Sequence, residues 1–499
     1  MPPRLAAGPG DGAGRIPAMQ SKSSSLRHLA TAVAALAALL AAPALRATNG
    51  MDLEGYGPVA TALGGASMAY DNGTAAVINN PATLGLMTDP ARLDLALGVL
   101  GPDITATSPA SANNVFGVAP NQSAKSSATA FYMPALGYAR RSGDFVYGLG
   151  VFGQGGMGCE YDANSWRGLG FGLKNRSEVS VGRVILPLAY KVNDRWLIGA
   201  TADFVWAGMD VQMAMSGAQF FDLVMPTSQQ FGRASGTIVQ SFGQVLQTMP
   251  AGTSVDYAYF NFSNGSPFTG AARSYGYGAK VGVVYTPSKE IRFGLVYHTP
   301  TSLSDMKADG KTMSFQLNVP GMGHVPQSLT GDYRVIDFQW PALLAGGLAW
   351  YPANRWMVVA DLREVFWRNV MSQFHMSFTA SNATANGPFA GQNLDAVLFQ
   401  DWDNQTVVEL GAAYEASDSL TLRVGANFSN DPVPNQYLNC LFPAIVKDHL
   451  TAGLGWKLDE HSSFDASFTY GFGVTVTNGT GATISHKQTN AQLMYSYRF

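Results

Sequence analysis

Histidine is the side chain best suited to acid–base chemistry near neutral pH, and six histidines follow residue 47. Catalysis would need one of them beside a nucleophile and an orienting group, as in a Gly-x-Ser-x-Gly hydrolase, and that motif is absent from the chain. We therefore expect polar loop or rim histidines, with no catalytic site, metal site or cofactor. The six are His298, His324, His375, His449, His461 and His486.

Two arginines, Arg363 and Arg423, could bind the carboxylate of a ligand. Each lies in an alternating segment in a position that should face the interior of a barrel. The alternative is that they pair with neighbouring acids such as Asp361 or Asp465. The sequence leaves both uses open.

The composition of the chain favours a membrane protein that crosses by strands. Only 13% of the 499 residues are charged, against about a quarter in soluble domains. A net charge of −3 excludes a nucleic-acid partner. Apart from the N-terminal segment, no apolar run approaches the roughly 20 residues of a membrane helix. Closed barrels of strands are the other structure that a bilayer permits.

Residues 1–47 are typical of a signal peptide, with a basic start, the apolar core Leu29–Leu40 and small residues after it. Met19 is an alternative start. The signal implies export, and in an exported protein Cys159 and Cys440 either pair or stay free.

Residues 91–499 repeat one pattern, in which apolar and polar side chains alternate and then reverse at a polar turn. In the last segment Leu493, Tyr495, Tyr497 and Phe499 share one face. Side chains alternate between the faces of a strand, so each segment has one apolar face. This pattern predicts an all-β, transmembrane antiparallel β-barrel, apolar outside and polar inside. A terminal Phe499 also resembles the assembly signal of exported barrels, which implies the barrel-assembly machinery as a partner.

Six tight turns pair twelve strands, and a first and a last strand bring the expected number to about 14. The turns are 141–144, 193–194, 287–290, 352–354, 416–419 and 459–462.

The other connections are long and are expected as loops on the outside. One of them, 210–272, contains a helical pattern whose apolar face could meet a hydrophobic ligand or pack on the barrel rim. That face consists of Ile238, Phe242, Val245, Leu246 and Met249. The expected loops are 101–126, 155–177, 210–272, 304–334, 370–403, 430–446 and 476–487.

Residues 48–90 are rich in Gly, Ala and Asn and do not alternate. They are too few and too small to form a core of their own. A barrel of about 14 strands leaves room inside, so we expect this segment to be a hatch in the lumen. Its characteristic residues are Gly64, Gly65, Asn80, Pro81 and Ala82.

The order of short motifs along the chain resembles that of the outer-membrane long-chain fatty acid and aromatic hydrocarbon transporters of the FadL and TodX type. The motifs are Ala47-Thr48-Asn49-Gly50, Gly55-Tyr56-Gly57, Gly64-Gly65-Ala66, Asn80-Pro81-Ala82, Pro102-Asp103, Gly148–Phe152 with Gly156, Glu160 and Tyr161, Asp431–Pro434 and Asp448-His449-Leu450.

The resemblance implies a monomeric, fourteen-stranded barrel in the bacterial outer membrane, among phospholipid and lipopolysaccharide, closed by an N-terminal hatch. It implies transport of hydrophobic molecules, with long-chain fatty acids expected and aromatic hydrocarbons as the alternative. A general porin would need an open lumen, which residues 48–90 argue against. An outer-membrane enzyme would need the catalytic motif that is missing.

A cluster of glycines interrupts the third strand, which begins regularly at Phe145. Without side chains and with weaker pairing, these positions favour a bend or a bulge, or else the start of a flexible loop. Family members interrupt this strand to open a side gap toward the membrane, so the resemblance implies a lateral opening here. The glycines are Gly153, Gly155, Gly156 and Gly158.

Overall fold

The computed structural model describes residues 50–225, 228–266 and 269–499. The expected signal peptide lies outside the described residues, as do the first residues of the expected hatch. Within the described residues, no helix has both the length and the apolar character to span a bilayer. The helices are α2 (Pro58–Thr61), η1 (Gly73–Val77), η2 (Pro81–Leu86), η3 (Trp166–Gly168), α3 (Gly217–Val224), α4 (Thr237–Thr248), η4 (Trp367–Asn369), η5 (Thr384–Phe389) and η6 (Asn435–Tyr437).

The rest of the regular structure is a single antiparallel sheet. Its strands are β1 (Ala91–Thr107), β2 (Ser123–Lys125), β3 (Phe131–Ser142), β4 (Phe145–Tyr161), β5 (Asn175–Lys191), β6 (Trp196–Ser216), β7 (Gly232–Ser235), β8 (Ser254–Phe262), β9 (Ala272–Tyr285), β10 (Ile291–His298), β11 (Ser302–Leu303), β12 (Met306–Val319), β13 (Gly323–Ile336), β14 (Leu343–Trp350), β15 (Trp356–Val365), β16 (Gln373–Ala380), β17 (Asn393–Phe399), β18 (Gln405–Glu415), β19 (Leu420–Ser429), β20 (His449–Lys457), β21 (Ser462–Thr477) and β22 (Thr483–Arg498).

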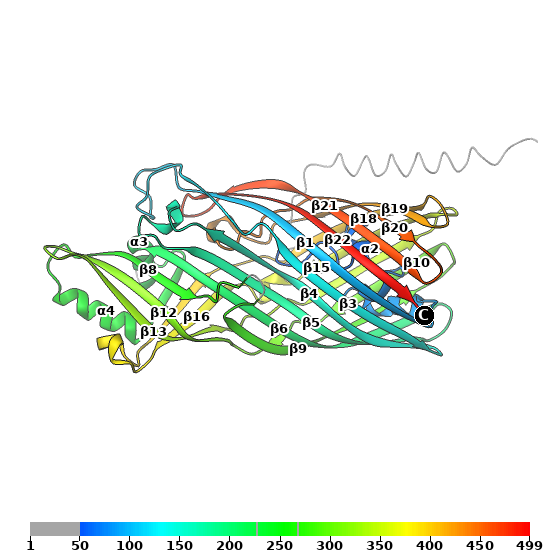
Figure 1. Cartoon of the computed structure of the whole chain (residues 1–499), viewed down its shortest axis with the longest axis horizontal. Helices are drawn as coiled ribbons and strands as arrows, with labels where there is room; N and C mark the ends of the chain where they lie inside the picture. Colours follow the sequence, from blue (N-terminus) through cyan, green and yellow to red (C-terminus); the bar gives the residue numbers. More distant parts are fainter. Residues whose placement is uncertain (1–49, 226–227, 267–268) are drawn as a thin grey trace, which may run out of the picture. The chain divides into compact units, whose positions relative to one another are not determined.

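Strand pairing closes this sheet into a barrel, because β22 pairs along its length with β1. The two strands lie side by side in Figure 1, one blue and one red. Each of the six predicted tight turns connects two neighbouring strands of the ring. Around the ring the order is β1, β3, β4, β5, β6, β9, β10, β14, β15, β18, β19, β20, β21, β22 and again β1.

The predicted alternation is present along the wall. On β10 the side chains of Phe293, Leu295 and Tyr297 are exposed, whereas Val296 and His298 between them are buried. The outer surface of the ring is therefore apolar, as a surface in contact with lipid must be.

The prediction of irregular loops at 304–334 and 370–403 is wrong, because both form hairpins of strands. With β2, β7, β8 and β11 they extend the sheet beyond the ring. The ring itself has 14 strands, the number expected from the turns, and the whole sheet has 22. A β-bulge interrupts the alternation of side chains in β12, so alternation does not predict this strand. Its buried positions change phase between Ala308 and Met313, around Gly310, whose φ is +64°.

The interior of the ring is filled by residues 50–90, which touch strands on opposite sides. The backbone N–H of Thr74 donates to the Asp94 carboxylate of β1 at 2.8 Å. The N–H of Met68 donates to the Asp361 carboxylate of β15, half a ring away, at 3.0 Å. Nearly all of this segment is buried.

Candidate functional site

The wall of the ring has a window between β3 and β4. In the described chain these strands pair only as far as Ala135 opposite Phe152. Residues 131–134 of β3 continue with β1 alone, and residues 153–161 of β4 continue with β5 alone. The window ends where the N–H of Ser127 donates to a β4 carbonyl at 2.8 Å.

A cavity of about 370 Å³, here called the wall cavity, lies at this window. Its volume falls in the range of small-molecule sites. Its few polar neighbours include Glu178, His486 and Gln488, and within the described residues neither Lys nor Arg lines it. The cavity therefore suits an apolar molecule or the apolar part of one. Apolar lining residues include Phe131, Tyr132, Met133, Val151, Phe152 and Trp206.

The four glycines expected at a lateral opening all line the wall cavity. The expected bulge is present, since the pairing of β4 with β5 shifts between Gly153 and Gly155. A Cβ at Gly156 would overlap the Val179 carbonyl, so no side chain fits there. A Cβ at Gly153 would meet the end of the Met133 side chain at 2.6 Å, which can move aside. Gly158 faces the Phe131 ring across the window.

The interior segment approaches the wall closely at Gly64 and Gly65, whose φ angles are +74° and +99°. The Gly64 N–H donates to Thr451 Oγ1, and Asn427 Nδ2 donates to the Gly64 carbonyl, both at 3.0 Å. A Cβ at Gly64 would overlap the backbone of Ala426. These glycines allow the segment to lie against the wall.

Asn80, Pro81 and Ala82 begin the helix η2 inside the ring. The Asn80 side-chain oxygen accepts from the Ala82 N–H at 3.1 Å and its Nδ2 donates to the Met68 carbonyl at 2.8 Å. Pro81 occupies the first helical position, where its missing N–H costs nothing. The Asn80 side chain thus joins two turns of the interior segment.

The interior segment also reaches the free edge of β4 at the window. The N–H of Gly156 donates to the Met51 carbonyl at 3.0 Å, and Asp52 forms a β-bridge with Gly155. The Tyr56 hydroxyl donates to the Asp52 carboxylate and lies 2.6 Å from the Gln154 carbonyl. The interior segment and the bulge are therefore one connected structure.

Both candidate anchor arginines are used within the protein, which is the alternative left open by the sequence. Nη1 of the buried Arg363 lies 3.5 Å from Glu409 Oε1 and 3.8 Å from Asp52 Oδ2. Arg423 Nη1 lies 2.8 Å from Asp465 Oδ1, the partner named above. Burial raises the pKa of the Asp52 carboxyl, and Arg363 opposes that rise.

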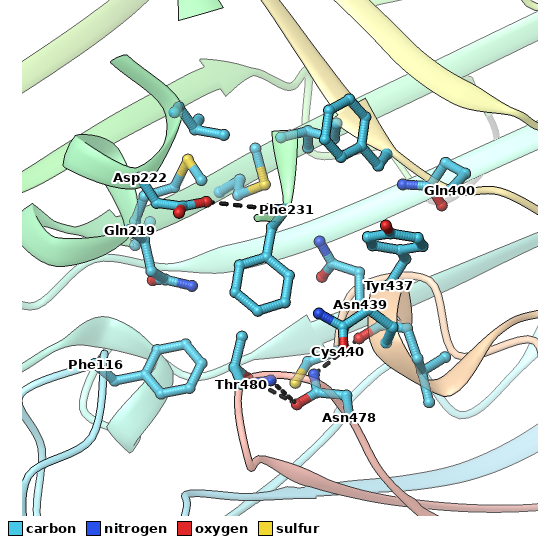
Figure 2. A pocket seen from close by; sticks show the side chains of 18 of the residues that line it. Phe116, Gln219, Asp222, Phe231, Gln400, Tyr437, Asn439, Cys440, Asn478 and Thr480 are labelled. Atoms are coloured by element: carbon cyan, nitrogen blue, oxygen red, sulfur yellow. Dashed lines mark hydrogen bonds between the residues drawn. The ribbon is translucent and has the colours of Figure 1, made fainter. Parts of the chain in front are cut away.

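A second cavity of about 90 Å³, here called the outer cavity, lies among the long connections (Figure 2). In Figure 2 the Phe231 ring lies between Asp222 on one side and the Tyr437 and Asn439 side chains on the other. Arg167 also lines this cavity.

In the part of the chain that the structure describes, Arg167 is the buried cation that has no ion pair with an acid. Its side chain is 5% exposed, and its guanidinium carbon lies 5.5 Å from the ring centre of Phe116 and 4.9 Å from that of Trp166. Among the described residues no carboxylate lies within 4.0 Å of it, and its Nε has no hydrogen-bond partner. A buried charge is costly unless paired, so Arg167 is a candidate for contact with an anionic group.

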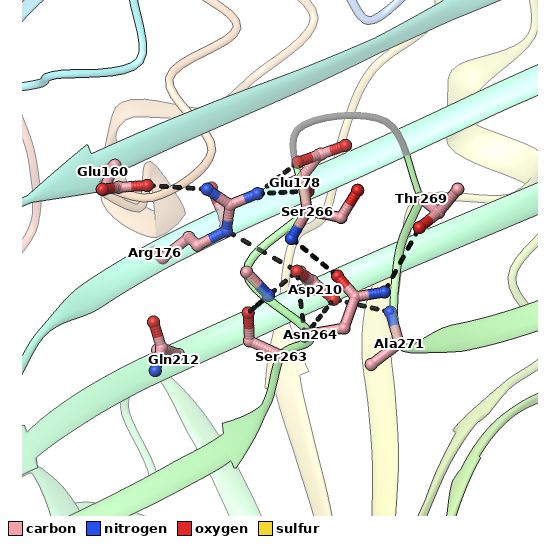
Figure 3. Close-up of polar contacts among 12 residues, drawn as sticks. Glu160, Arg176, Glu178, Asp210, Gln212, Ser263, Asn264, Ser266, Thr269 and Ala271 are labelled. Atoms are coloured by element: carbon pink, nitrogen blue, oxygen red, sulfur yellow. Dashed lines mark hydrogen bonds and ion pairs between the residues drawn. The ribbon is translucent and has the colours of Figure 1, made fainter.

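A charged cluster on β4, β5 and β6 is joined by internal ion pairs and hydrogen bonds (Figure 3). Arg176 Nη1 lies 2.6 Å from Glu160 and its Nη2 contacts Glu178. Asp210, which is fully buried, accepts from the backbone N–H groups of Asn264 at 3.2 Å and Ala271 at 2.6 Å. The cluster binds Asn264 and Ala271 to β6, and its Glu178, which also lines the wall cavity, is paired with Arg176.

The apolar face of the predicted helix packs within the protein. Ile238 and Phe242 of α4 are buried, and Val245, Leu246 and Met249 pack against the same core. The Phe242 ring centre lies 5.0 Å from that of Phe315 on β12. The face supports the extended strands, so a role in ligand binding has no support in the structure.

Phe499 is 56% exposed at the closing edge of the barrel. Its N–H donates to the Ala91 carbonyl at 2.9 Å, which ties the chain end to β1. Its ring centre lies 4.9 Å from that of Tyr497. The role of Phe499 as an assembly signal stays a prediction.

The histidine and cysteine predictions have mixed outcomes. His298, His449 and His486 are buried side chains rather than polar residues of a loop or the rim, because the interior segment and the connections cover them. Cys159 and Cys440 are both buried and free. Among the described residues no group of His, Cys, Asp or Glu could hold a metal ion.

Two features have no clear signal in the sequence. Arg167 lies in a long connection, where the one local signal is the adjacent Trp166, whose ring could stack on the Arg167 guanidinium. Residues 435–446, an irregular segment that enters the barrel, contain no alternation or helical period that would predict their burial.

Comparisons of the sequence and of the structure with known proteins point to the same family. The family of outer membrane transport proteins described as OMPP1/FadL/TodX matches residues 34–497. A crystal structure of the Pseudomonas putida toluene transporter TodX has a TM-score of 0.75 and 29% identity, covering 90% of this chain and 99% of that one.

Of two relatives in sequence, the first gives the same indication. The long-chain fatty acid transport protein of Escherichia coli is 22% identical over 432 residues, 84% of this chain and 85% of that protein. An uncharacterised Chlorobium limicola protein is 46% identical over 82 residues, so the match spans 40% of its length and 16% of this chain. The chain belongs to the OMPP1/FadL/TodX family and is an outer-membrane β-barrel transport protein for hydrophobic molecules.

Proposed function

We propose that this protein takes up long-chain fatty acids across the outer membrane. The ligand enters the outer cavity from outside, moves to the wall cavity and leaves through the window between β3 and β4 into the bilayer. A greasy chain that follows this route does not have to cross water. Residues 50–90 act as a hatch that keeps the barrel closed to water and small solutes.

The observation that carries the choice of ligand is Arg167. A buried guanidinium with no carboxylate beside it, in a cavity whose lining includes aromatic rings, suits a molecule with one anionic end. The wall cavity has an apolar lining and suits the hydrocarbon chain of the same molecule. A fatty acid carries both parts.

The alternative is the uptake of aromatic hydrocarbons. Two observations favour it: the 29% identity with the toluene transporter TodX, and the wall cavity, whose described lining holds no cation. A neutral aromatic molecule would not need Arg167. The two candidates therefore differ in how far uptake depends on this residue.

The proposal includes the surroundings of the barrel. We expect a monomer, with phospholipid and lipopolysaccharide against its apolar outer surface. We also expect insertion by the barrel-assembly machinery, with Phe499 as part of the signal that this machinery reads.

The test is whole-cell uptake of radiolabelled oleate and of radiolabelled toluene by cells that express the protein, its Arg167→Leu variant or its Arg292→Leu variant. Arg292 is the matched control, because it too stacks on an aromatic ring, that of Tyr351 at 5.1 Å, yet lines neither cavity. We expect R167L to slow oleate uptake roughly tenfold or more, the effect of losing a hydrogen bond to a charged group. R292L should have little effect.

Oleate uptake that is equal in R167L and R292L would contradict the fatty-acid proposal. Toluene uptake that is unaffected by R167L, with no oleate uptake by any variant, would establish the alternative.

A further inference from the structure

We propose that residues 435–446, here called the strap, form a movable partition between the outer cavity and the wall cavity, and that wall side chains hold it shut. This inference rests on the proposed function, because a partition matters only if a ligand has to pass from one cavity to the other.

The strap contributes to both cavities without joining them. Residues 436–440 line the outer cavity, whereas Pro443 and Ala444 line the wall cavity. The two linings share no residue within the described chain. Leu441, which lies between these two stretches, is fully buried, as is Ile445 after them. A molecule that moves from one cavity to the other must therefore displace the strap.

Side chains of the surrounding wall hold the strap by its carbonyl groups. Asn478 Nδ2 donates to the Leu438 carbonyl at 2.8 Å, and the Tyr161 hydroxyl donates to the Cys440 carbonyl at 2.9 Å. These two bonds hold the part of the strap that faces the outer cavity.

The other half is held in the same way. The Ser177 hydroxyl donates to the Leu441 carbonyl. His486 Nδ1 lies 2.9 Å from the Pro443 carbonyl, and because a carbonyl only accepts, this nitrogen carries the proton. The four donors come from β4, β5, β22 and the connection after β21, so they clasp the strap from several parts of the ring.

This mode of attachment suits an element that moves. After η6 the strap has no regular structure, and its backbone forms local bonds such as Phe442 N–H to the Asn439 carbonyl at 3.0 Å. Releasing the strap breaks these neutral hydrogen bonds, each of small net stability, and exposes its buried apolar side chains, but it breaks no strand pairing. Releasing it leaves the ring intact.

The native thiol of Cys440 reports strap opening. It is 3% exposed although it lines the outer cavity, so a maleimide should react with it slowly while the strap is in place and faster when the strap moves. The chain has two cysteines, so a Cys159→Ser background leaves Cys440 as the single thiol. The rate of alkylation by N-ethylmaleimide is measured on the full-length, folded protein in detergent.

Two tyrosines provide a matched pair of variants in that background. Tyr161→Phe removes the hydroxyl that holds the strap, and Tyr259→Phe removes a hydroxyl that donates to the Lys174 carbonyl at 2.8 Å, away from the strap. We expect alkylation to be roughly two- to tenfold faster in Y161F and unchanged in Y259F, as the loss of one neutral hydrogen bond implies. Ser177→Ala should behave like Y161F and serves if that variant folds poorly.

Uptake of oleate by whole cells separates this inference from the proposed function. If the strap limits transfer, Y161F and S177A should take up oleate faster than Y259F. Equal alkylation in Y161F, S177A and Y259F, or faster alkylation with unchanged uptake, would overturn the strap as a partition. Absence of oleate uptake in every variant, the unaltered protein included, would instead overturn the proposed function and leave the alkylation result standing.

Discussion

Single residues decide which charges remain for a ligand. Arg363 and Arg423 face inward as the alternation predicts, but acidic side chains of the protein lie beside them, Glu409 and Asp52 at Arg363 and Asp465 at Arg423. Alternation gives the direction of a side chain and says nothing about its partners, because these come from other strands and from the interior segment. For Arg167 even the direction of the side chain could not be predicted, because it lies in a connection without a regular period. Its place at the cavity depends on segments that are distant in the sequence.

The Asp52 carboxyl should make the docking of the interior segment depend on pH. Its pKa is raised by burial, so docking is favoured while the group is protonated, and this contribution is lost as the pH rises through the raised pKa. Each unit of the rise corresponds to about 1.4 kcal/mol. When the pH is lowered from 8 to 4, the melting temperature in detergent should rise. We expect this rise to be larger in the unaltered protein than in the Asp52→Asn variant.

Asp71→Asn is the control for this measurement, because Asp71 belongs to the same segment but is exposed. Its pH dependence should match that of the unaltered protein. If Asp52→Asn shows the same dependence as well, Asp52 does not couple docking to pH.

At the scale of elements, the pattern of the sequence predicts most of the wall. The six tight turns and the strands between them follow from alternation and turn residues, since a half-buried strand leaves both marks locally. Alternation and turn residues do not predict the strands β12, β13, β16 and β17. In β12 the bulge shifts the phase of the alternation. In addition, none of these strands belongs to the lipid-facing ring, so they do not have one apolar face toward lipid and one polar face toward the lumen.

The interior segment should behave as a removable plug. Its contacts with the wall are apolar packing, side-chain hydrogen bonds, close glycine approaches, an ion pair and one β-bridge, whereas the ring closes through its own strand pairs. Deletion of residues 50–85 should therefore leave a folded barrel with a much larger single-channel conductance in planar bilayers. A folded deletion variant whose conductance equals that of the unaltered protein would show that this segment does not close the lumen.

At the scale of the whole molecule, the window, the bulge and the interior segment occupy one place. The interior segment is bonded to the free edge of β4 at Gly155 and Gly156, where the wall cavity opens. The sequence indicates the glycine cluster and the small-residue segment separately. Their contact could not be predicted, because no local pattern relates residues 51–52 to a strand about a hundred positions later.

Exit of the ligand through the window between β3 and β4 is the central step of the proposed route, and the Gly153→Val variant tests this step directly. A valine side chain there has room if Met133 moves aside, and it would fill the window without touching the hatch. Gly346→Val is the matched control, since Gly346 is a wall glycine of β14 with space for a Cβ at 3.4 Å from Leu295. Both variants should fold, as judged by heat-modifiable mobility.

The measurement is the initial rate of radiolabelled oleate uptake by whole cells, together with oleate binding to the purified proteins. We predict that G153V loses most of its uptake, roughly tenfold, while its binding stays within about a factor of four, the range of a small change at an apolar site. G346V should resemble the unaltered protein in both. Uptake by G153V at the rate of G346V would contradict lateral exit and leave an axial route past the interior segment.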